Sequence, residues 1–305
     1  MQTDIGPSDA RILITGGAGF IGSHLADALV ADNEVRVLDD FSTGFRDQVP
    51  DEAEIVEGDV CDPDIVEEAM DGVDIVFHEA AVVSIPKTVD DPLSSNEVNV
   101  TATLRLLERA REESARVVCA SSAAIYGNPD TVPVTETDAL RPSSPYGIQK
   151  LTLDHYTRLY NELYDLDTVV LRYFNVYGPR AEAGEYGDVV SVFLRQCRGG
   201  GPITIEGDGA QTRDFVHVDD VVQANLRAAT TDAVGEAYNI GCGEKITISA
   251  LAEKVRDLTA GDVDITHVDP RPGDIDESLA DISKAREGLR YAPTVELDDG
   301  LASIV

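Results

Sequence analysis

Short apolar runs alternate with amphipathic segments along the first half of the chain. Apolar runs of strand length cover 11–15, 34–38, 54–57, 74–77, 116–120 and 168–174. Apolar residues recur at helical spacing over 20–30, 92–113 and 145–163. Strands that alternate with helices predict an α/β fold, a doubly wound parallel sheet with right-handed crossovers and helices on both faces.

The alternation loosens after residue 176. Further helices are predicted over 189–198, 219–229 and 248–258, and short strands over 202–206, 237–240 and 263–267. We therefore expect two domains, a regular one over 10–176 and a smaller, mixed α/β lobe over 177–305. Some of the later segments could return to the main sheet.

A glycine-rich turn joins the first predicted strand to the first helix. Gly16, Gly19 and Gly22 are spaced as G-x-x-G-x-x-G, overlapping a G-x-G-x-x-G pattern, and the helix begins with Phe20 and Ile21. Residues without Cβ let the backbone approach a pyrophosphate, and the helix N-terminus offers it free N–H groups and partial positive charge. The turn predicts a dinucleotide site in a Rossmann-type fold.

Two carboxylates, Asp39 and Asp40, follow the second strand at about the 20-residue offset of a ribose-binding acid. They would also repel a 2′-phosphate, and no Arg directly follows the strand to neutralise one. NAD is therefore predicted rather than NADP. The next turn, Ser42, Thr43 and Gly44, could cover the adenosine or be a plain loop.

Later strand ends carry further candidate contacts to the cofactor. Asp59, which precedes Val60, could bond the adenine amino group or cap the following helix. The small residues Ala80 and Ala81, just after His78, would let the backbone approach the cofactor diphosphate. Because ligands collect at the carboxyl ends of parallel strands, we expect these residues to share an edge with the glycine-rich turn.

Acidic residues far outnumber basic ones, 57 against 24, for a net charge of −33. Such a chain repels nucleic acid and anionic membranes, so neither is expected as a partner. Acids spread over every segment are typical of a surface adapted to high salt, which screens their repulsion, and we interpret the protein as halophilic. No apolar run approaches about 18 residues and no signal peptide is visible, which predicts a cytoplasmic protein.

The cysteines and histidines show no ligand or disulfide pattern. Cys61, Cys119, Cys197 and Cys242 are widely separated and form no C-x-x-C pair. The five histidines have no metal-ligand spacing. Neither disulfides nor a metal site are predicted.

Tyr146 and Lys150 lie one turn apart on a predicted helix, so their side chains share a face. A free phenol has a pKa of about 10 and is a poor base at neutral pH. A nearby Lys cation and a positively charged nicotinamide would both favour the phenolate. The alternative is an exposed Tyr and Lys on an ordinary helix. Ser122, at the end of the preceding strand, offers a hydroxyl to bridge substrate and phenol, and we predict these three residues as the catalytic group.

These motifs together resemble the extended short-chain dehydrogenase/reductase family, and within it nucleotide-sugar epimerases of the UDP-glucose 4-epimerase type. The matching segments span nearly the whole chain: GGAGFIG, GDV, HEAA, SSAAIYG, YGIQK, LRYFNVYGPR, GDGAQTRDFVHVDDV, NIGCGE and RPGD. The resemblance implies a bound NAD that is not consumed. Tyr146 would take the proton of the sugar 4-hydroxyl while C4 gives its hydride to the nicotinamide. The 4-keto sugar would then turn and receive the hydride on its opposite face.

The resemblance also assigns binding residues. Asn175, Arg213 and Arg271 would contact the substrate diphosphate, and Asp274 the uridine ribose. Arginines suit diphosphate oxygens, although ion pairs with neighbouring acids are the alternative for both. The remaining candidates are Asn99, Ala120 and Tyr173 for the cofactor and Ser84, Ala123 and Val190 for the substrate.

Three positions bear on the reaction and the sugar. The resembling dehydratases and decarboxylases carry acidic residues just after the catalytic Ser or Thr, where this chain has Ala123 and Ala124, and this favours epimerisation. Ser278 stands where a bulky Tyr excludes N-acetylated sugars in the resembling epimerases, so UDP-N-acetylglucosamine is expected to be accepted besides UDP-glucose. A uronic sugar stays open, because Arg180 could face its carboxylate.

Two other functions remain as alternatives, a dehydratase, decarboxylase or reductase on the same scaffold, and a non-catalytic NAD sensor, which would be expected to lack the Tyr or Lys. The resemblance also implies a homodimer in which helices 92–113 and 145–163 form a four-helix bundle with their copies. Burial inside one subunit would explain their apolar residues equally well. The seam would contain Leu104, Leu107, Leu153 and Leu159.

Overall fold

A seven-stranded parallel sheet forms the centre of the computed structural model, which describes residues 6–181, 188–259, 263–270 and 275–305. Its strands are β1 (Arg11–Thr15), β2 (Glu34–Asp39), β3 (Glu54–Glu57), β4 (Ile75–His78), β5 (Arg116–Ser122), β6 (Thr168–Tyr173) and β11 (Glu236–Ile240). The order is β11-β6-β5-β4-β1-β2-β3, and every neighbouring pair is parallel. The strand order reverses between β1 and β4, where doubly wound sheets bind their ligands. The predicted Rossmann-type fold is confirmed.

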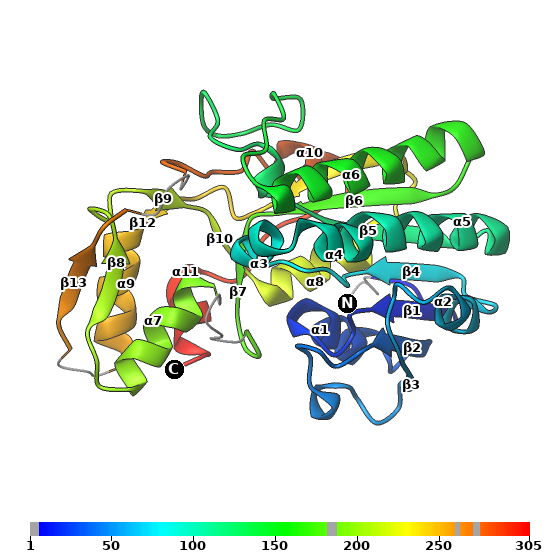
Figure 1. Ribbon diagram of the computed structural model, residues 1–305, viewed down its shortest axis with the longest axis horizontal. Helices are drawn as coiled ribbons and strands as arrows, with labels where there is room; N and C mark the ends of the chain where they lie inside the picture. The colour runs from blue at the N-terminus through cyan, green and yellow to red at the C-terminus, as the bar shows by residue number, and fades with distance from the viewer. Residues whose placement is uncertain (1–5, 182–187, 260–262, 271–274) are drawn as a thin grey trace.

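Helices cover both faces of this sheet (Figure 1). On one face lie α1 (Phe20–Leu29) and α8 (Val218–Ala228), and on the other α2 (Pro63–Met70), α5 (Thr103–Glu113) and α6 (Pro145–Tyr164). Each face has its own apolar core, because successive strand residues point to opposite sides. In β4, for example, Phe77 packs under α1 and α8, whereas Val76 packs under α2 and α5.

The region 92–113 is helical as predicted, but it is not one regular helix. It consists of α4 (Pro92–Asn96), a π-helical stretch η2 (Glu97–Ala102) and α5, and it is preceded by α3 (Ile85–Asp90).

The cap of α2 is Asp62, whose carboxylate accepts the N–H of Asp64 at 3.0 Å. Asp59 therefore does not cap this helix, and its carboxylate accepts the N–H of Cys61 instead.

The smaller lobe has a separate apolar core. It contains α7 (Val189–Arg198), α9 (Ile248–Leu258), α11 (Leu297–Ala302) and the parallel pair β8 (Ile203–Glu206) and β13 (Ile265–Val268) (Figure 1). Segments α8 and β11 return to the main sheet, as the sequence allowed. The remaining elements are η1 (Arg46–Gln48), η3 (Ala123–Ile125), β7 (Asn175–Tyr177), β9 (Thr212–Arg213), β10 (Phe215–His217), β12 (Ile246–Thr247) and α10 (Ser283–Gly288). Among the described residues, no helix has the length and apolar character needed to span a membrane.

Candidate active site

The glycine-rich turn after β1 is closed so tightly that side chains would not fit. A Cβ on Gly16, whose φ is +69°, would stand 2.7 Å from the backbone nitrogen of Ala80, and one on Gly22 would stand 2.3 Å from the carbonyl oxygen of Gly16. Helix α1 begins after Gly19 with no side chain capping it and no acid in its first turn. Its N-terminal N–H groups can therefore serve an anion, and the cradle fits a dinucleotide diphosphate.

Asp39 is held in place at the mouth of this turn. Its two carboxylate oxygens accept the N–H groups of Ala18 at 2.9 Å and Phe41 at 2.8 Å, and each keeps a further lone pair for a ribose hydroxyl. Burial raises its pKa above the usual value, while the two hydrogen bonds lower it. The fixed carboxylate has the position and chemistry predicted for a ribose acceptor.

The loop after Asp39 packs directly on the glycine-rich turn. A Cβ on Gly44 would lie 2.6 Å from the backbone of Ala18, and Phe45 donates its N–H to the Ala18 carbonyl at 3.0 Å. Asp40, Ser42 and Thr43 are exposed on this loop. This contact favours the predicted cover over a loop that is independent of the site.

The predicted catalytic residues come from two elements in direct contact. Ser144 caps α6 by accepting the N–H of Gly147 at 3.1 Å, so the helix starts just before Tyr146. A Cβ on Gly147 would stand only 2.8 Å from the carbonyl oxygen of Ala124, which means that α6 packs against the turn that follows Ser122. Only glycine permits this approach.

Lys150 lies one turn further along α6 and is 4% exposed. Its ammonium group donates to the carbonyl oxygen of Ala120 at 2.8 Å and stands 6.0 Å from the centre of the Tyr146 ring. Ala120 precedes Ser122 on β5, so one strand end holds the Lys cation and also carries the Ser hydroxyl. This arrangement suits proton transfer at a substrate hydroxyl.

Comparison with known proteins agrees with this geometry. Residues 12–241 match the model of the NAD dependent epimerase/dehydratase family. A relative described as a putative UDP-glucose 4-epimerase, from Methanocaldococcus jannaschii, is 38% identical over 96% of this chain and 97% of its own length. The chain belongs to this epimerase/dehydratase family.

Solved structures of the family share the whole fold. A UDP-N-acetylglucosamine 4-epimerase from Methanobrevibacter ruminantium, in complex with UDP-N-acetylmuramic acid, superimposes with a TM-score of 0.94 at 36% identity, covering 97% of each chain. A UDP-glucose 4-epimerase from Thermus thermophilus, in complex with NAD, gives 0.89 at 37% identity, covering 96% of each. The chain is an NAD-dependent enzyme of the nucleotide-sugar epimerase type.

His78, one of the predicted cofactor residues, lies beneath the glycine-rich turn and the Ala80 loop. The ring of His78 is buried between the hydroxyls of Thr15, at 2.7 Å, and Thr103, at 2.9 Å. Burial lowers the pKa of His78 to about 3, so the ring is neutral. The Thr15 hydroxyl also accepts the N–H of Ala80 at 3.3 Å, so His78 supports the loop that contains Ala80. Asp59 is exposed and Val60 is buried next to it.

Asn99 is buried in the π-helical stretch, and its side chain binds the backbone of Val82. Its amide oxygen accepts the Val82 N–H at 2.7 Å, and its amide nitrogen donates to Gln149 at 2.7 Å. Gln149 in turn donates to Ser95 at 2.9 Å. The pair fixes the segment that contains Ala81. Single π-helical turns of this kind are frequent at functional sites. The sequence did not predict this role of Gln149, although the residue lies between Tyr146 and Lys150.

The predicted substrate residues gather around Asp214. Asn175 donates its side-chain N–H to the Asp214 carbonyl at 2.9 Å, and Ser278 donates its backbone N–H to Thr212 at 3.0 Å. Arg213 lies between these two contacts and is 9% exposed. The structure therefore brings Asn175, Arg213 and Ser278 together, whereas Arg271 and Asp274 lie outside the described residues.

The carboxylate of Asp214 is fully buried and ties two further segments to this group. It accepts the N–H groups of Cys242 at 2.8 Å, Gly243 at 3.0 Å and Ala280 at 3.1 Å. Burial raises the pKa of Asp214 to about 6. Since its oxygens serve backbone donors, Asp214 acts as a structural support for the candidate substrate segments.

Three other candidates are engaged elsewhere. Val190 has no exposed surface and packs in the core of the smaller lobe, which argues against a substrate contact. Arg180 is paired with Asp27 of α1 at 2.6 Å, so its guanidinium gives no support to a uronic sugar. Ser84 accepts the N–H of Lys87 at 3.3 Å as the cap of α3.

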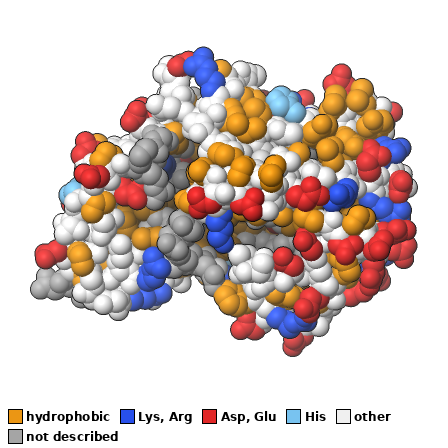
Figure 2. Space-filling model, viewed as in Figure 1, with side chains coloured by type: hydrophobic (Ala, Val, Ile, Leu, Met, Phe, Trp, Pro, Cys, Tyr) orange, Lys and Arg blue, Asp and Glu red, His pale blue; other side chains and the backbone are white. Residues whose placement is uncertain are grey.

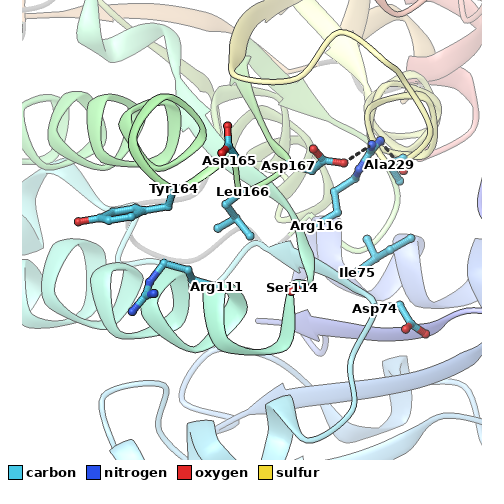
Figure 3. A pocket seen from close by; sticks show the side chains of 10 residues that line it. All are labelled: Asp74, Ile75, Arg111, Ser114, Arg116, Tyr164, Asp165, Leu166, Asp167 and Ala229. Atoms are coloured by element: carbon cyan, nitrogen blue, oxygen red, sulfur yellow. Dashed lines mark hydrogen bonds and ion pairs between the residues drawn. The ribbon is translucent and has the colours of Figure 1, made fainter.

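A hollow of about 430 Å³ lies at the opposite, amino end of the strands (Figure 3). Arg116, at the start of β5, donates to Asp167 at 2.9 Å and to the Ala229 carbonyl at 2.9 Å. Its charge is therefore satisfied within the fold. Because ligands of such sheets bind at the carboxyl ends, this hollow is not the active site.

Proposed function

We propose that the protein inverts C4 of a UDP-sugar, with UDP-glucose and UDP-galactose as one pair and their N-acetylated counterparts as another. The family and its UDP-sugar 4-epimerases support the reaction class. The observation that carries the proposal is the contact of α6 with the turn after Ser122, in which Lys150 bonds Ala120 and the residues directly after Ser122 are Ala123 and Ala124 rather than acids.

Each residue of this group has one task in the proposed reaction. Tyr146 takes the proton from the sugar 4-hydroxyl, and Lys150, anchored on Ala120, favours the phenolate through its charge. Ser122 bridges the substrate oxygen and the phenol. Bound NAD would supply the acceptor and donor of the C4 hydride. The glycine-rich turn and Asp39 hold the cofactor.

The residues after Ser122 separate epimerisation from elimination. Ala123 and Ala124 form the first turn of η3 and carry no group that could protonate a leaving hydroxyl or act as a base. Dehydration would need such an acid near the sugar. The proposal is therefore an isomerase rather than a dehydratase or decarboxylase.

We assign the nucleotide and the sugar to the segments around Asp214. Asn175, Arg213 and Arg271 contact the diphosphate and Asp274 the ribose. Ser278 is 5% exposed, and we assign it to the wall beside sugar C2, where its small side chain supports a substituent. The lobe over 177–305 supplies most of this surface, and the domain over 10–176 supplies the NAD site.

Turnover of UDP-glucose and UDP-N-acetylglucosamine by the purified protein tests the proposal. Both C4 epimers should form without release of NADH or of a 4-keto sugar. The Tyr146→Phe variant should lose about 10²- to 10⁴-fold in kcat and still bind NAD. Bulk formation of a 4-keto or decarboxylated product would contradict the proposal, and inactivity on the acetylated sugar alone would remove only the role of Ser278.

We also propose a homodimer through the outer face of α6. Figure 2 shows hydrophobic side chains gathered where α6 runs. Two residues of the predicted seam, Leu107 and Leu153, are buried inside the subunit, and Leu104 packs partly against the same core. Leu159 is 39% exposed. The apolar residues exposed with it on α3, α4 and α6 are Ile85, Val89, Leu93, Ile148, Tyr156, Leu163 and Tyr164.

Such an apolar patch marks an interface more often than free surface. The variant Leu159→Glu should elute as a monomer in size-exclusion chromatography. Leu258→Glu is the matched control, because Leu258 is 38% exposed but lies on α9 of the smaller lobe. A dimer that survives Leu159→Glu would contradict the proposal.

A further inference from the structure

One acid at the active edge of the sheet has no task in the reaction described above. Glu79 directly follows β4, and its carboxylate accepts the hydroxyl of Tyr173 at 2.8 Å. The Tyr173 hydroxyl in turn accepts the side-chain N–H of Asn225, also at 2.8 Å. Both hydrogen bonds of this series, from Asn225 to Tyr173 and from Tyr173 to Glu79, are donated in the direction of the carboxylate. Such donors stabilise an ionised acid.

The Glu79–Tyr173 bond passes across the end of β5. In the sheet register, His78 of β4 is opposite Cys119 of β5, and Tyr173 of β6 is opposite Ser122. Glu79 is thus next to the strand residue that follows Cys119, and that residue is Ala120, the acceptor of Lys150. The bond therefore connects β4 and β6 over the residues that carry the catalytic group.

Glu79 also shares this region with a small number of titratable groups. Tyr173 of β6 donates to it, Lys150 of α6 and Cys119 of β5 are near enough to interact with its charge, and His78 precedes it on β4. Burial raises the pKa of the Cys119 thiol to about 11 and lowers that of His78 to about 3, so both are neutral at pH 7. Lys150 is thus the cation that a charge on Glu79 would oppose.

We propose that Glu79 is a positioning residue, which holds the end of β5 through Tyr173 and, by its change of charge, controls how strongly the Lys150 cation acts on the catalytic phenol. This inference rests on the proposed function. The Glu79 carboxyl changes charge near neutral pH, because burial raises its pKa to about 7 against the opposing effects of Tyr173 and Lys150.

The variant Glu79→Gln tests the inference, because it keeps an acceptor for Tyr173 and removes the charge. At pH 6 both proteins should turn over alike. At pH 8 the wild-type anion offsets part of the Lys150 field, so the variant should exceed the wild type by on the order of 5-fold in kcat/KM. The ionisation near pH 7 should be missing from its pH profile.

Thermal unfolding gives a second measurement that needs no turnover. The folded-state pKa of Glu79 is raised, so its stabilising contribution is present below about pH 4.5 and is lost as the pH rises through 7. The wild type should therefore lose Tm relative to Glu79→Gln between pH 5 and 8. Glu136→Gln is the matched control: burial raises the Glu136 pKa as well, and its carboxylate accepts the N–H of Asn239. It should leave the pH profile of kcat/KM unchanged.

Failure of the inference and failure of the proposed function give different results. An activity ratio of Glu79→Gln to wild type that stays flat from pH 6 to 8 overturns the inference in an enzyme that epimerises UDP-sugars. An equal pH dependence of Tm overturns it as well, since the carboxyl would not then titrate in this range. A wild type that turns over no UDP-sugar refutes the proposed function and the inference with it.

Discussion

Replacement of Gly147 by Ala tests whether close packing positions the phenol of Tyr146, the proposed catalytic base. The added Cβ would stand 2.8 Å from the carbonyl oxygen of Ala124 and 3.0 Å from Cβ of Pro142, where ordinary contact begins at 3.4 Å. The Ala124 oxygen is a backbone atom and the Pro142 Cβ is part of the proline ring, so neither can turn aside. The start of α6 must therefore move by about 0.6 Å, the difference between 3.4 and 2.8 Å. Tyr146, which directly precedes Gly147, moves with it.

The expected effect is on rate rather than on stability. A displacement of about 1 Å at a reacting group costs roughly 10²-fold, so a shift of this size should lower kcat on the order of 10-fold. Ala in a helix gains about 1 kcal/mol over Gly, which offsets part of the strain, and Tm should change little. Steady-state turnover of UDP-glucose and thermal unfolding measure the two quantities.

Gly288→Ala is the matched control. Gly288 lies in α10, away from the strand end that carries the proposed catalytic group. A Cβ there would stand 2.7 Å from the ring of Tyr238 on β11. This variant should lose stability and keep wild-type kcat. If Gly147→Ala retained full kcat with an unchanged Tm, the contact of α6 with η3 would not determine where the phenol lies.

Three further predictions follow from charge and burial. Arg172→Met leaves the fully buried Asp154 without its partner at 2.8 Å and should lower the free energy of unfolding in urea by about 3 kcal/mol. Arg158→Met removes the partly exposed partner of the same acid and should lower it by under about 1 kcal/mol. The pKa of His78 is lowered to about 3, so its contribution to stability is complete at a pH above the ordinary value of about 6.5 and is lost as the pH falls below it. Between pH 7 and 5 the wild type should therefore lose about 2 kcal/mol relative to His78→Gln, and equal losses would show that His78 is not buried neutral. With a net charge of −33, Tm should rise between about 0.1 M and 1 M KCl, and a flat Tm would contradict the halophilic interpretation.

Local signals predicted most elements with accurate bounds. Helices 189–198 and 248–258 begin and end as the apolar spacing indicated, because each carries a strong amphipathic pattern and a polar cap. The region 92–113 was less accurate. The π-helical turn at Asn99 depends on contacts with Val82 and Gln149, which lie far away in the chain. No local pattern of residues encodes such contacts.

The fold class, the glycine-rich turn, the acid after β2 and the Tyr–Lys pair could be predicted from the residues alone, because spacing along a strand or one helix face is a local property. What each buried polar group binds became visible only in the folded chain. His78 turned out to be a support beneath the diphosphate loop, Val190 a core residue, and Arg180 a partner of Asp27. Glu79 became a candidate only when β4, β5 and β6 were side by side. Hydrogen bonds between distant segments depend on where the chain returns, and that is decided by the packing of the whole sheet.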